Sequence, residues 1–198
     1  MYKELLWIFT QLPDDYIVLD TETTGLPDEN GPPDIVTLGI TVVRYRKIGA
    51  SVEFKIRPQK PISAEAQSIH GITNQQAAEF ESFDAQWDQI AEYLKDQLIV
   101  IHNASFDWPI LQDHVARYGL SMPPIQGVFC SQKAAIAWAQ VMDLSCSHRG
   151  PSLDALTKAL GVEDLRAKRN GIHGAKIDSK LTYRVVEVMK QYGLDSND

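Results

Sequence analysis

A chain of 198 residues and 22.2 kDa suits a single compact domain. Hydrophobic residues make up 44% of it and charged residues 23%, a globular composition that excludes wholesale disorder. The 19 Lys and Arg against 26 Asp and Glu give a formal charge of −7. That charge excludes a protein that holds nucleic acid by blanket charge attraction alone.

The first half of the chain predicts a helix followed by a three-stranded meander. A short amphipathic run indicates a helix over residues 2–12, which Pro13 ends. A turn-rich stretch then covers residues 24–34. Three runs of strand-forming residues make up the meander, with a turn expected at 47–50 between the last two: residues 16–20, 35–46 and 51–56.

Helices alternate with strands in the second half. The apolar run at residues 98–101 predicts a central strand that is buried on both faces. Apolar spacing predicts a helix over residues 82–94, and Gly119 ends another over residues 106–118. The other expected elements are a short helix from residue 63, a strand at 128–130, and helices over 132–141, 152–160 and 175–192. This order predicts an α/β domain with helices packed on a mixed central β-sheet.

The chain shows no sign of a disulfide framework or of a membrane segment. Cys130 and Cys146 lack metal-ligand spacing, so we expect two reduced thiols in a cytoplasmic protein. Glu4 interrupts the N-terminal apolar run, which does not resemble a signal peptide, and no run of 18 apolar residues occurs. We expect one domain over residues 1–198, with its motifs within about 16–190, and no membrane partner.

Two carboxylates lie at the C-terminal end of the first predicted strand. Asp20 and Glu22 stand two residues apart, and side chains with that spacing on a strand point to the same face. Ligands of open α/β sheets bind just outside such strand ends. A divalent cation would remove the repulsion between the two carboxylates, whereas a solvated turn after a strand is the alternative.

A third carboxylate, Asp107, lies where the strand at 98–101 leads into a helix. We expect Ser105 as the N-cap of that helix and Pro109 in its first turn. Asp107 shares the apolar stripe of the helix, and a core-facing carboxylate is costly unless it is paired or metal-bound. The alternative is an acidic residue that the helix macrodipole favours near the N-terminus.

His173 and Asp178 flank the start of the last predicted helix. Asp178 lies beside the buried face of the helix, whereas His173, next to Gly174, is expected on the entering loop. From there His173 would reach the same place from another direction. A solvent-exposed loop histidine is the alternative.

Four carboxylates and one histidine at the ends of apolar elements together indicate a common site. Carboxylate-rich sites suit Mg²⁺ or Mn²⁺ rather than zinc. Two such ions would clamp the attacking and leaving oxygens of a phosphodiester. A histidine can take a proton from an attacking water at neutral pH.

Three motifs, in order, resemble the DEDDh family of 3′–5′ exonucleases, the DnaQ-like group that includes bacterial proofreading subunits and RNase T. The resemblance runs from about Tyr16 to Val188. Gly174 stands where a sister group carries Tyr, so the histidine form is the match. The matching segments are Asp20-Thr21-Glu22-Thr23-Thr24-Gly25-Leu26, His102-Asn103-Ala104-Ser105-Phe106-Asp107 and His173-x-Ala175-x-x-Asp178.

The resemblance implies a ribonuclease H-like fold and hydrolysis of terminal nucleotides to 5′-monophosphates. It makes His173 the general base and assigns two divalent cations, Mg²⁺ or Mn²⁺, to four ligands: Asp20, Glu22, Asp107 and Asp178. Core packing is the alternative role for Leu26 and Phe106. The positions that match the family's substrate site are Thr23, Leu26, Glu65, His70, Asn103 and Phe106.

A basic cluster surrounds the third motif, either as a contact for the phosphate backbone or as a solvated basic face. Its members are Arg166, Lys168, Arg169, Lys176, Lys180 and Arg184. Nearby, Asp154 is expected to be structural. Thr37 stands where many relatives have Glu, which leaves the fine substrate preference open. Two bound divalent ions would leave a net charge of −3, so we expect metal loading to precede the binding of nucleic acid.

The leading hypothesis is a metal-dependent 3′–5′ exodeoxyribonuclease that acts on single-stranded or frayed DNA ends. A 3′–5′ exoribonuclease like RNase T is the alternative, because contacts to the 2′-OH decide between the two substrates. A non-catalytic subunit that binds nucleic acid or a polymerase is less favoured, since all five catalytic positions are occupied. Twenty residues follow Asp178, which favours a self-standing exonuclease over one with a polymerase-binding tail. A replication or repair partner that docks elsewhere, and a homodimer, stay open.

Overall fold

A five-stranded sheet forms the centre of the computed structural model, which describes residues 6–29 and 31–194. The strand order is β3-β2-β1-β4-β5, antiparallel from β3 to β1 and parallel from β1 to β5. The sheet is therefore mixed, and the predicted meander is confirmed. The strands are β1 (Tyr16–Thr23), β2 (Ile35–Arg44), β3 (Lys47–Lys55), β4 (Leu98–Ile101) and β5 (Gly127–Cys130).

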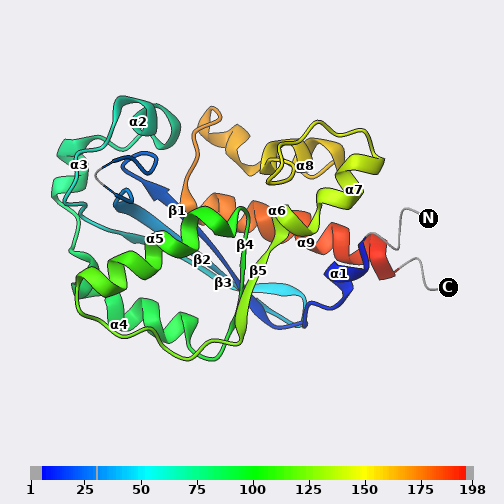
Figure 1. Ribbon diagram of the computed structural model, residues 1–198, viewed down its shortest axis with the longest axis horizontal. Coiled ribbons are helices and arrows are strands. Elements are labelled where there is room, and N and C mark those ends of the chain that lie inside the picture. Colours follow the sequence, from blue (N-terminus) through cyan, green and yellow to red (C-terminus); the bar gives the residue numbers. More distant parts are fainter. Residues whose placement is uncertain (1–5, 30, 195–198) are drawn as a thin grey trace.

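Helices cover both faces of this sheet, as an α/β domain requires (Figure 1). Helices α4 and α5 pack on one face, whereas α1, α7, α8 and α9 pack on the other. Those on the first face and at its end are α2 (Ala64–His70), α3 (Asn74–Ala78), α4 (Phe83–Leu94) and α5 (Ala104–Arg117). The others are α1 (Trp7–Thr10), α6 (Ser131–Ala134), α7 (Ile136–Val141), α8 (Leu153–Ala159), the 3₁₀-helix η2 (Leu165–Arg169) and α9 (Ala175–Leu194).

The side chains of β1 alternate between two hydrophobic cores. Ile17 and Leu19 pack with α4 and α5, and Tyr16 and Val18 pack with α1 and α9. All four are buried. This double burial fixes the register of β1, because a shift by one residue would exchange its two faces.

Gly39 lets α9 come into close contact with the sheet. A Cβ atom on Gly39 would lie 2.2 Å from the carbonyl carbon of Ala175, the first residue of α9. Gly39 is also the cross-strand partner of Asp20. The absent side chain therefore brings the first turn of α9 beside the end of β1.

Several boundaries differ from the predicted ones. The turn expected at residues 47–50 is instead a two-residue hairpin at Tyr45 and Arg46, both with positive φ, and β3 begins at Lys47. The single helix expected over 132–141 breaks at Ala135 into α6 and α7. Helix α3 and the 3₁₀-helix η2 were not predicted, because segments of five residues carry little periodicity.

Three further expectations concern the N-terminal helix, the two cysteines and membrane-spanning helices. The first helix is described only at Trp7–Thr10, and residues 2–5 of its predicted range lie outside the described residues. Cys130 and Cys146 are free thiols, as expected. Among the helices in the described part of the chain, none has both the length and the apolar character needed to cross a bilayer.

Replacement of Gly39 by alanine should destabilise the fold, because the added methyl group overlaps backbone atoms that cannot rotate away. We expect a loss of about 2–3 kcal/mol in the free energy of unfolding, measured by urea denaturation. Gly49→Ala in β3 is the matched control, since its Cβ would meet no atom closer than 3.8 Å. Equal stability of the two variants would contradict the close approach of α9.

Candidate active site

The end of β1 presents two carboxylates to the side of the sheet that α9 covers. Asp20 and Glu22 share the face of Val18, whereas Thr21 between them points toward α5. Glu22 is buried and Asp20 is partly buried. The strand continues through both residues to Thr23, so a solvated turn does not account for them.

Asp107 reaches the same strand end from α5. It is buried, and its Oδ1 accepts hydrogen bonds from the Thr21 backbone N–H at 3.1 Å and from the Thr21 hydroxyl at 2.6 Å. These bonds hold Asp107 against the residue between Asp20 and Glu22. The structure thus shows a paired, core-facing carboxylate rather than an acid placed only by the helix macrodipole.

The start of α5 differs from the predicted one. Asn103, in the left-handed conformation with φ 65°, precedes the helix, which begins at Ala104. Ser105 therefore is not the N-cap; it lies in the first turn and donates to Asn103 Oδ1 at 2.9 Å. Pro109 likewise lies inside the helix rather than in its first turn. The left-handed Asn103 starts the helix directly after β4, which aims Asp107 at the end of β1.

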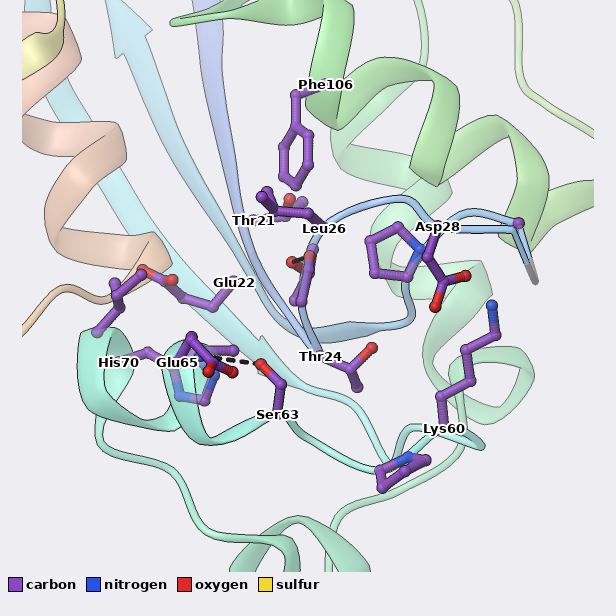
Figure 2. A pocket seen from close by; sticks show the side chains of 17 residues that line it. Thr21, Glu22, Thr24, Leu26, Asp28, Lys60, Ser63, Glu65, His70 and Phe106 are labelled. Atoms are coloured by element: carbon purple, nitrogen blue, oxygen red, sulfur yellow. Dashed lines mark hydrogen bonds between the residues drawn. The ribbon is translucent and has the colours of Figure 1, made fainter.

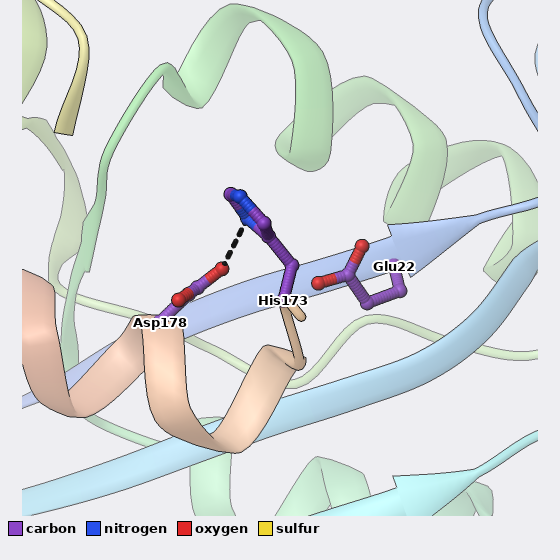
Figure 3. A group of neighbouring side chains, drawn as sticks. All are labelled: Glu22, His173 and Asp178. Atoms are coloured by element: carbon purple, nitrogen blue, oxygen red, sulfur yellow. Dashed lines mark hydrogen bonds and ion pairs between the residues drawn. The ribbon is translucent and has the colours of Figure 1, made fainter. Parts of the chain in front are cut away.

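His173 and Asp178 complete the group from the third segment. His173 lies on the loop before α9, as predicted, and its Nδ1 is 2.8 Å from Asp178 Oδ2. Glu22, His173 and Asp178 offer ligand atoms that all lie within 4.8 Å of one another (Figure 3). His173 is therefore part of the carboxylate cluster and not an isolated surface histidine.

Burial and mutual repulsion perturb the acid groups of this cluster. Burial, followed by repulsion from Asp107 and Asp178, raises the pKa of Asp20 well above its ordinary value. Burial also raises the pKa of Asp107 to about 7, despite the bonds from Thr21. The hydrogen bond with Asp178 raises the pKa of His173. Burial and repulsion thus favour the protonated forms of Asp20 and Asp107.

The donor set fits a divalent cation. Asp178 Oδ1 is buried and has no hydrogen-bond partner, so one acceptor of the cluster is left for an ion. The other donors are carboxylate oxygens, which Mg²⁺ and Mn²⁺ prefer. The residues that could hold such ions are Asp20, Glu22, Asp107 and Asp178.

A cavity of about 860 Å³ adjoins Glu22, and its volume lies in the range of small-molecule binding sites. Figure 2 shows Glu22 at one side of it, with Leu26, Glu65, His70 and Phe106 around the opening. Thr23 also lines the cavity. Asn103 is not among its lining residues, so five of the six positions predicted to contact substrate are brought together and one is not.

The apolar residues of the cavity differ in their packing. Leu26 is 79% exposed, which excludes the core-packing alternative for it. Phe106 both lines the cavity and packs partly against the core of α4 and α5, so the two roles considered for it coexist.

Burial lowers the pKa of two histidines near the site. His70 Nδ1 accepts a hydrogen bond from the Ile72 backbone N–H at 3.0 Å, and burial lowers the pKa of His70. His102, from the second motif, lies 3.1 Å from Ser131 Oγ and 3.2 Å from the Pro151 carbonyl. Burial lowers its pKa to about 4. His102 therefore connects the end of β4 to the first residue of α6 and to the segment before α8, and it is not among the residues that line the cavity.

The basic cluster around the third motif is not a uniform solvated face. Arg166 is buried and is held by Asp154 and Asp164, so it does not extend toward solvent as a phosphate contact would. Arg184 pairs with Glu163 at 3.1 Å. The ion pair to Arg166 gives Asp154 a structural contact. Sequence reasoning missed the inward position of Arg166 because η2 has no periodic pattern from which to read a buried side.

A family model for exonucleases matches residues 17–186 of the chain. The DNA polymerase III subunit epsilon of Pasteurella multocida is 28% identical over 173 residues, which cover 85% of this chain and 65% of that relative. The chain thus spans just under two thirds of the length of that relative.

Solved structures agree with the sequence match. Exonuclease X in complex with 5′ overhanging duplex DNA superposes with a TM-score of 0.63 and 26% identity, covering 89% of this chain and 92% of that one. The nuclease domain of 3′hExo, a DEDDh family member bound to rAMP, superposes with a TM-score of 0.65. It is 15% identical, covers 91% of this chain and 94% of its own, and supports the fold alone. The chain therefore belongs to the exonuclease family and has the ribonuclease H-like fold of the DEDDh exonucleases.

Proposed function

We propose that this protein is a metal-dependent 3′–5′ exonuclease that releases nucleoside 5′-monophosphates from single-stranded or frayed DNA ends. One observation carries the proposal: four carboxylates and His173 converge from three chain segments beside a cavity of nucleotide size. A non-catalytic binding subunit would not need this costly group of buried acids. The family membership supports the reaction class, and the geometry of the cluster supports the residues proposed to perform it.

The carboxylates are the proposed ligands of two divalent cations, Mg²⁺ or Mn²⁺. When bound, the cations would stabilise the charge that develops on the attacking and leaving oxygens of the scissile phosphate. Asp20 and Glu22 present their oxygens from β1, and Asp178 presents from α9 its Oδ1, which accepts no hydrogen bond and lies 3.7 Å from Arg166 Nε. Thr21 fixes the orientation of Asp107 through two hydrogen bonds, so this ligand is preorganised.

His173 is the proposed general base. Its Nδ1 donates to Asp178 Oδ2, which leaves Nε2 unprotonated in the neutral imidazole and able to take a proton from the attacking water. The same bond stabilises the imidazolium that then forms, as the raised pKa of His173 indicates. Asp178 thus orients the base, in the manner of the carboxylate in a hydrolytic triad.

The cavity is the proposed site of the 3′-terminal nucleotide. Leu26 and Phe106 offer apolar surfaces against which a base or sugar would pack. Thr23, Glu65 and His70 offer polar groups near Glu22, and they are the proposed contacts to the terminal sugar. Asn103, placed at the start of α5, is a proposed contact at the edge of the site rather than in the cavity.

DNA is the proposed substrate on the strength of what similar proteins bind. The relative from Pasteurella multocida is a subunit of a DNA polymerase, and Exonuclease X is bound to duplex DNA. RNA is the second candidate, because the fold is shared with 3′hExo bound to rAMP. A replication or repair polymerase as partner and a homodimer stay predictions that the described residues do not test.

Cleavage should begin at the 3′ end and require a divalent metal. We expect 5′-labelled single-stranded DNA to shorten as a ladder with Mg²⁺ or Mn²⁺, and not with EDTA. Asp20→Ala should lower the rate by about 10³ or more, because it removes a ligand on which the charge stabilisation depends. Asp143→Ala, at an exposed position outside the cluster, is the control. RNA assayed in parallel decides between the substrates, and no cleavage of either polymer would refute the proposal.

Metal affinity should rise with pH. Asp107, with a pKa of about 7, and Asp20, with a pKa well above its ordinary value, must lose protons before they can bind a cation. Calorimetry should therefore show Mn²⁺ binding about tenfold weaker at pH 6 than at pH 8, with protons released to the buffer. Asp107→Asn should weaken binding, whereas Asp113→Asn on the same helix should not. Equal affinity at both pH values would argue against carboxylates as the ligands.

Removal of the proposed base should separate turnover from metal binding. We expect His173→Ala to lower kcat by about 10²–10⁴, because the attacking water loses its proton acceptor. Mn²⁺ affinity should change by less than about threefold, since the carboxylates remain. His148→Ala, at an exposed position, should behave as the wild type does. Near-normal kcat in His173→Ala would remove this residue from the mechanism.

A further inference from the structure

A buried arginine lies against the proposed general base. Arg166 is 3% exposed, although its neighbours Ala167 and Lys168 on η2 are exposed. A guanidinium in such a place is costly unless carboxylates and hydrogen bonds compensate for its lost hydration. The contacts of Arg166 therefore indicate its role.

Two aspartates hold Arg166 from the solvent side. Asp164 Oδ1 accepts from Arg166 Nε at 3.0 Å and from the Arg166 backbone N–H at 2.9 Å. Asp154, from the first turn of α8, bonds Arg166 Nη2. Burial lowers the pKa of Arg166, but these carboxylates outweigh it and the net shift of the pKa is upward. The guanidinium is therefore charged and fixed at both ends of its fork.

The inner side of Arg166 contacts the proposed catalytic pair. Its Nη1 lies 3.1 Å from His173 Nε2 and 3.4 Å from His173 Nδ1, and its Nε lies 3.7 Å from Asp178 Oδ1. A donor on the lone-pair axis of Nε2 would be much farther from Nδ1 than from Nε2. The similar distances to the two ring nitrogens therefore place Nη1 against the imidazole ring rather than on that axis.

The loop that carries His173 needs such a support. It follows η2 through Asn170 and Gly171, both with positive φ, and the His173 backbone N–H bonds the Ile69 carbonyl at 3.0 Å. The ring itself is held by Asp178 on one side, a residue that is also proposed to bind metal (Figure 3). Arg166 supplies the second side.

We propose that Arg166 is a positioning residue that orients His173 for proton transfer, with Asp154 and Asp164 as its anchors. This inference rests on the proposed function and deepens it, because it links η2 and α8 to the base. Buried and paired on both sides, Arg166 does not contact the phosphate backbone. Loss of a phosphate contact would raise KM and change its salt dependence, whereas loss of positioning lowers kcat.

Kinetics of Arg166→Ala distinguish these roles. We expect kcat to fall by about 10–100-fold with KM within about threefold, as for other residues that orient a functional group. Arg166→Lys should restore little, because an ammonium cannot reproduce the planar fork. Millimolar guanidinium should raise kcat of Arg166→Ala and not of His173→Ala. Lys158→Met, which removes an exposed positive charge from α8, is the matched control.

The ring of His173 can be observed without metal or substrate. In ¹⁵N-labelled, metal-free protein, at a pH above the imidazole pKa, we expect one Nδ1–H tautomer in the wild type and in Lys158→Met. Arg166→Ala should give a mixture of tautomers or an exchange-broadened signal. This measurement does not depend on turnover. An inactive wild type would therefore refute the proposed function, whereas the His173 spectrum would still test whether Arg166 positions the ring.

Three results would overturn the inference. The first is folded Arg166→Ala with wild-type kcat, and the second is a raised KM with unchanged kcat. The third is an unchanged His173 signal in Arg166→Ala. Should Arg166→Ala fail to fold by circular dichroism, Asp154→Asn applies the same test at an anchor that is 65% exposed. For Asp154→Asn we expect a fall in kcat of about 3–10-fold and a changed His173 signal. If this variant kept the wild-type kcat and the wild-type His173 signal, positioning by Arg166 would be refuted.

Discussion

Repulsion among buried carboxylates at the end of β1 is the constraint on which the rest of the structure depends. Asp107, Asp178 and Glu22 each raise the pKa of Asp20 or lie within its electrostatic reach, in a place where burial already disfavours charge. Bringing these carboxylates together lowers the stability of the folded chain. The fold supplies the compensation through two hydrophobic cores that clamp β1 and through the contact of α9 at Gly39.

The same repulsion defines what the site can bind. Arg166 is a positive group that lowers the pKa of Asp20, and its single charge faces several carboxylates. The remaining negative charge would repel a phosphodiester, and bound divalent cations would offset that repulsion. The overall charge of −7 points the same way. A net negative charge is compatible with a nuclease whose acidic residues bind metal ions, because the bound cations offset the repulsion of the substrate.

Elements with a strong pattern could be predicted from the sequence, and elements that depend on single conformations could not. The alternation of β1 places Asp20 and Glu22 on one face, and the apolar run at β4 identifies a central strand. In contrast, the left-handed Asn103 starts α5 two residues before the predicted Ser105 cap, with no glycine to mark it. The hairpin at Tyr45 and Arg46 likewise lacks the usual turn residues. In the sequence, Arg166 cannot be distinguished from the other basic residues around the third motif, because its burial results from tertiary contacts alone.

Thr37 extends this electrostatic argument to the neighbouring strand. It is the cross-strand partner of Glu22, it is buried, and it lines a second cavity that His173 also lines. A glutamate at this position would add another carboxylate next to Glu22 and increase the repulsion among the acids of the cluster. Threonine keeps the volume of the position small and adds no charge. The number of carboxylates beside the proposed metal ligands therefore depends on β2 as well as on the motif residues.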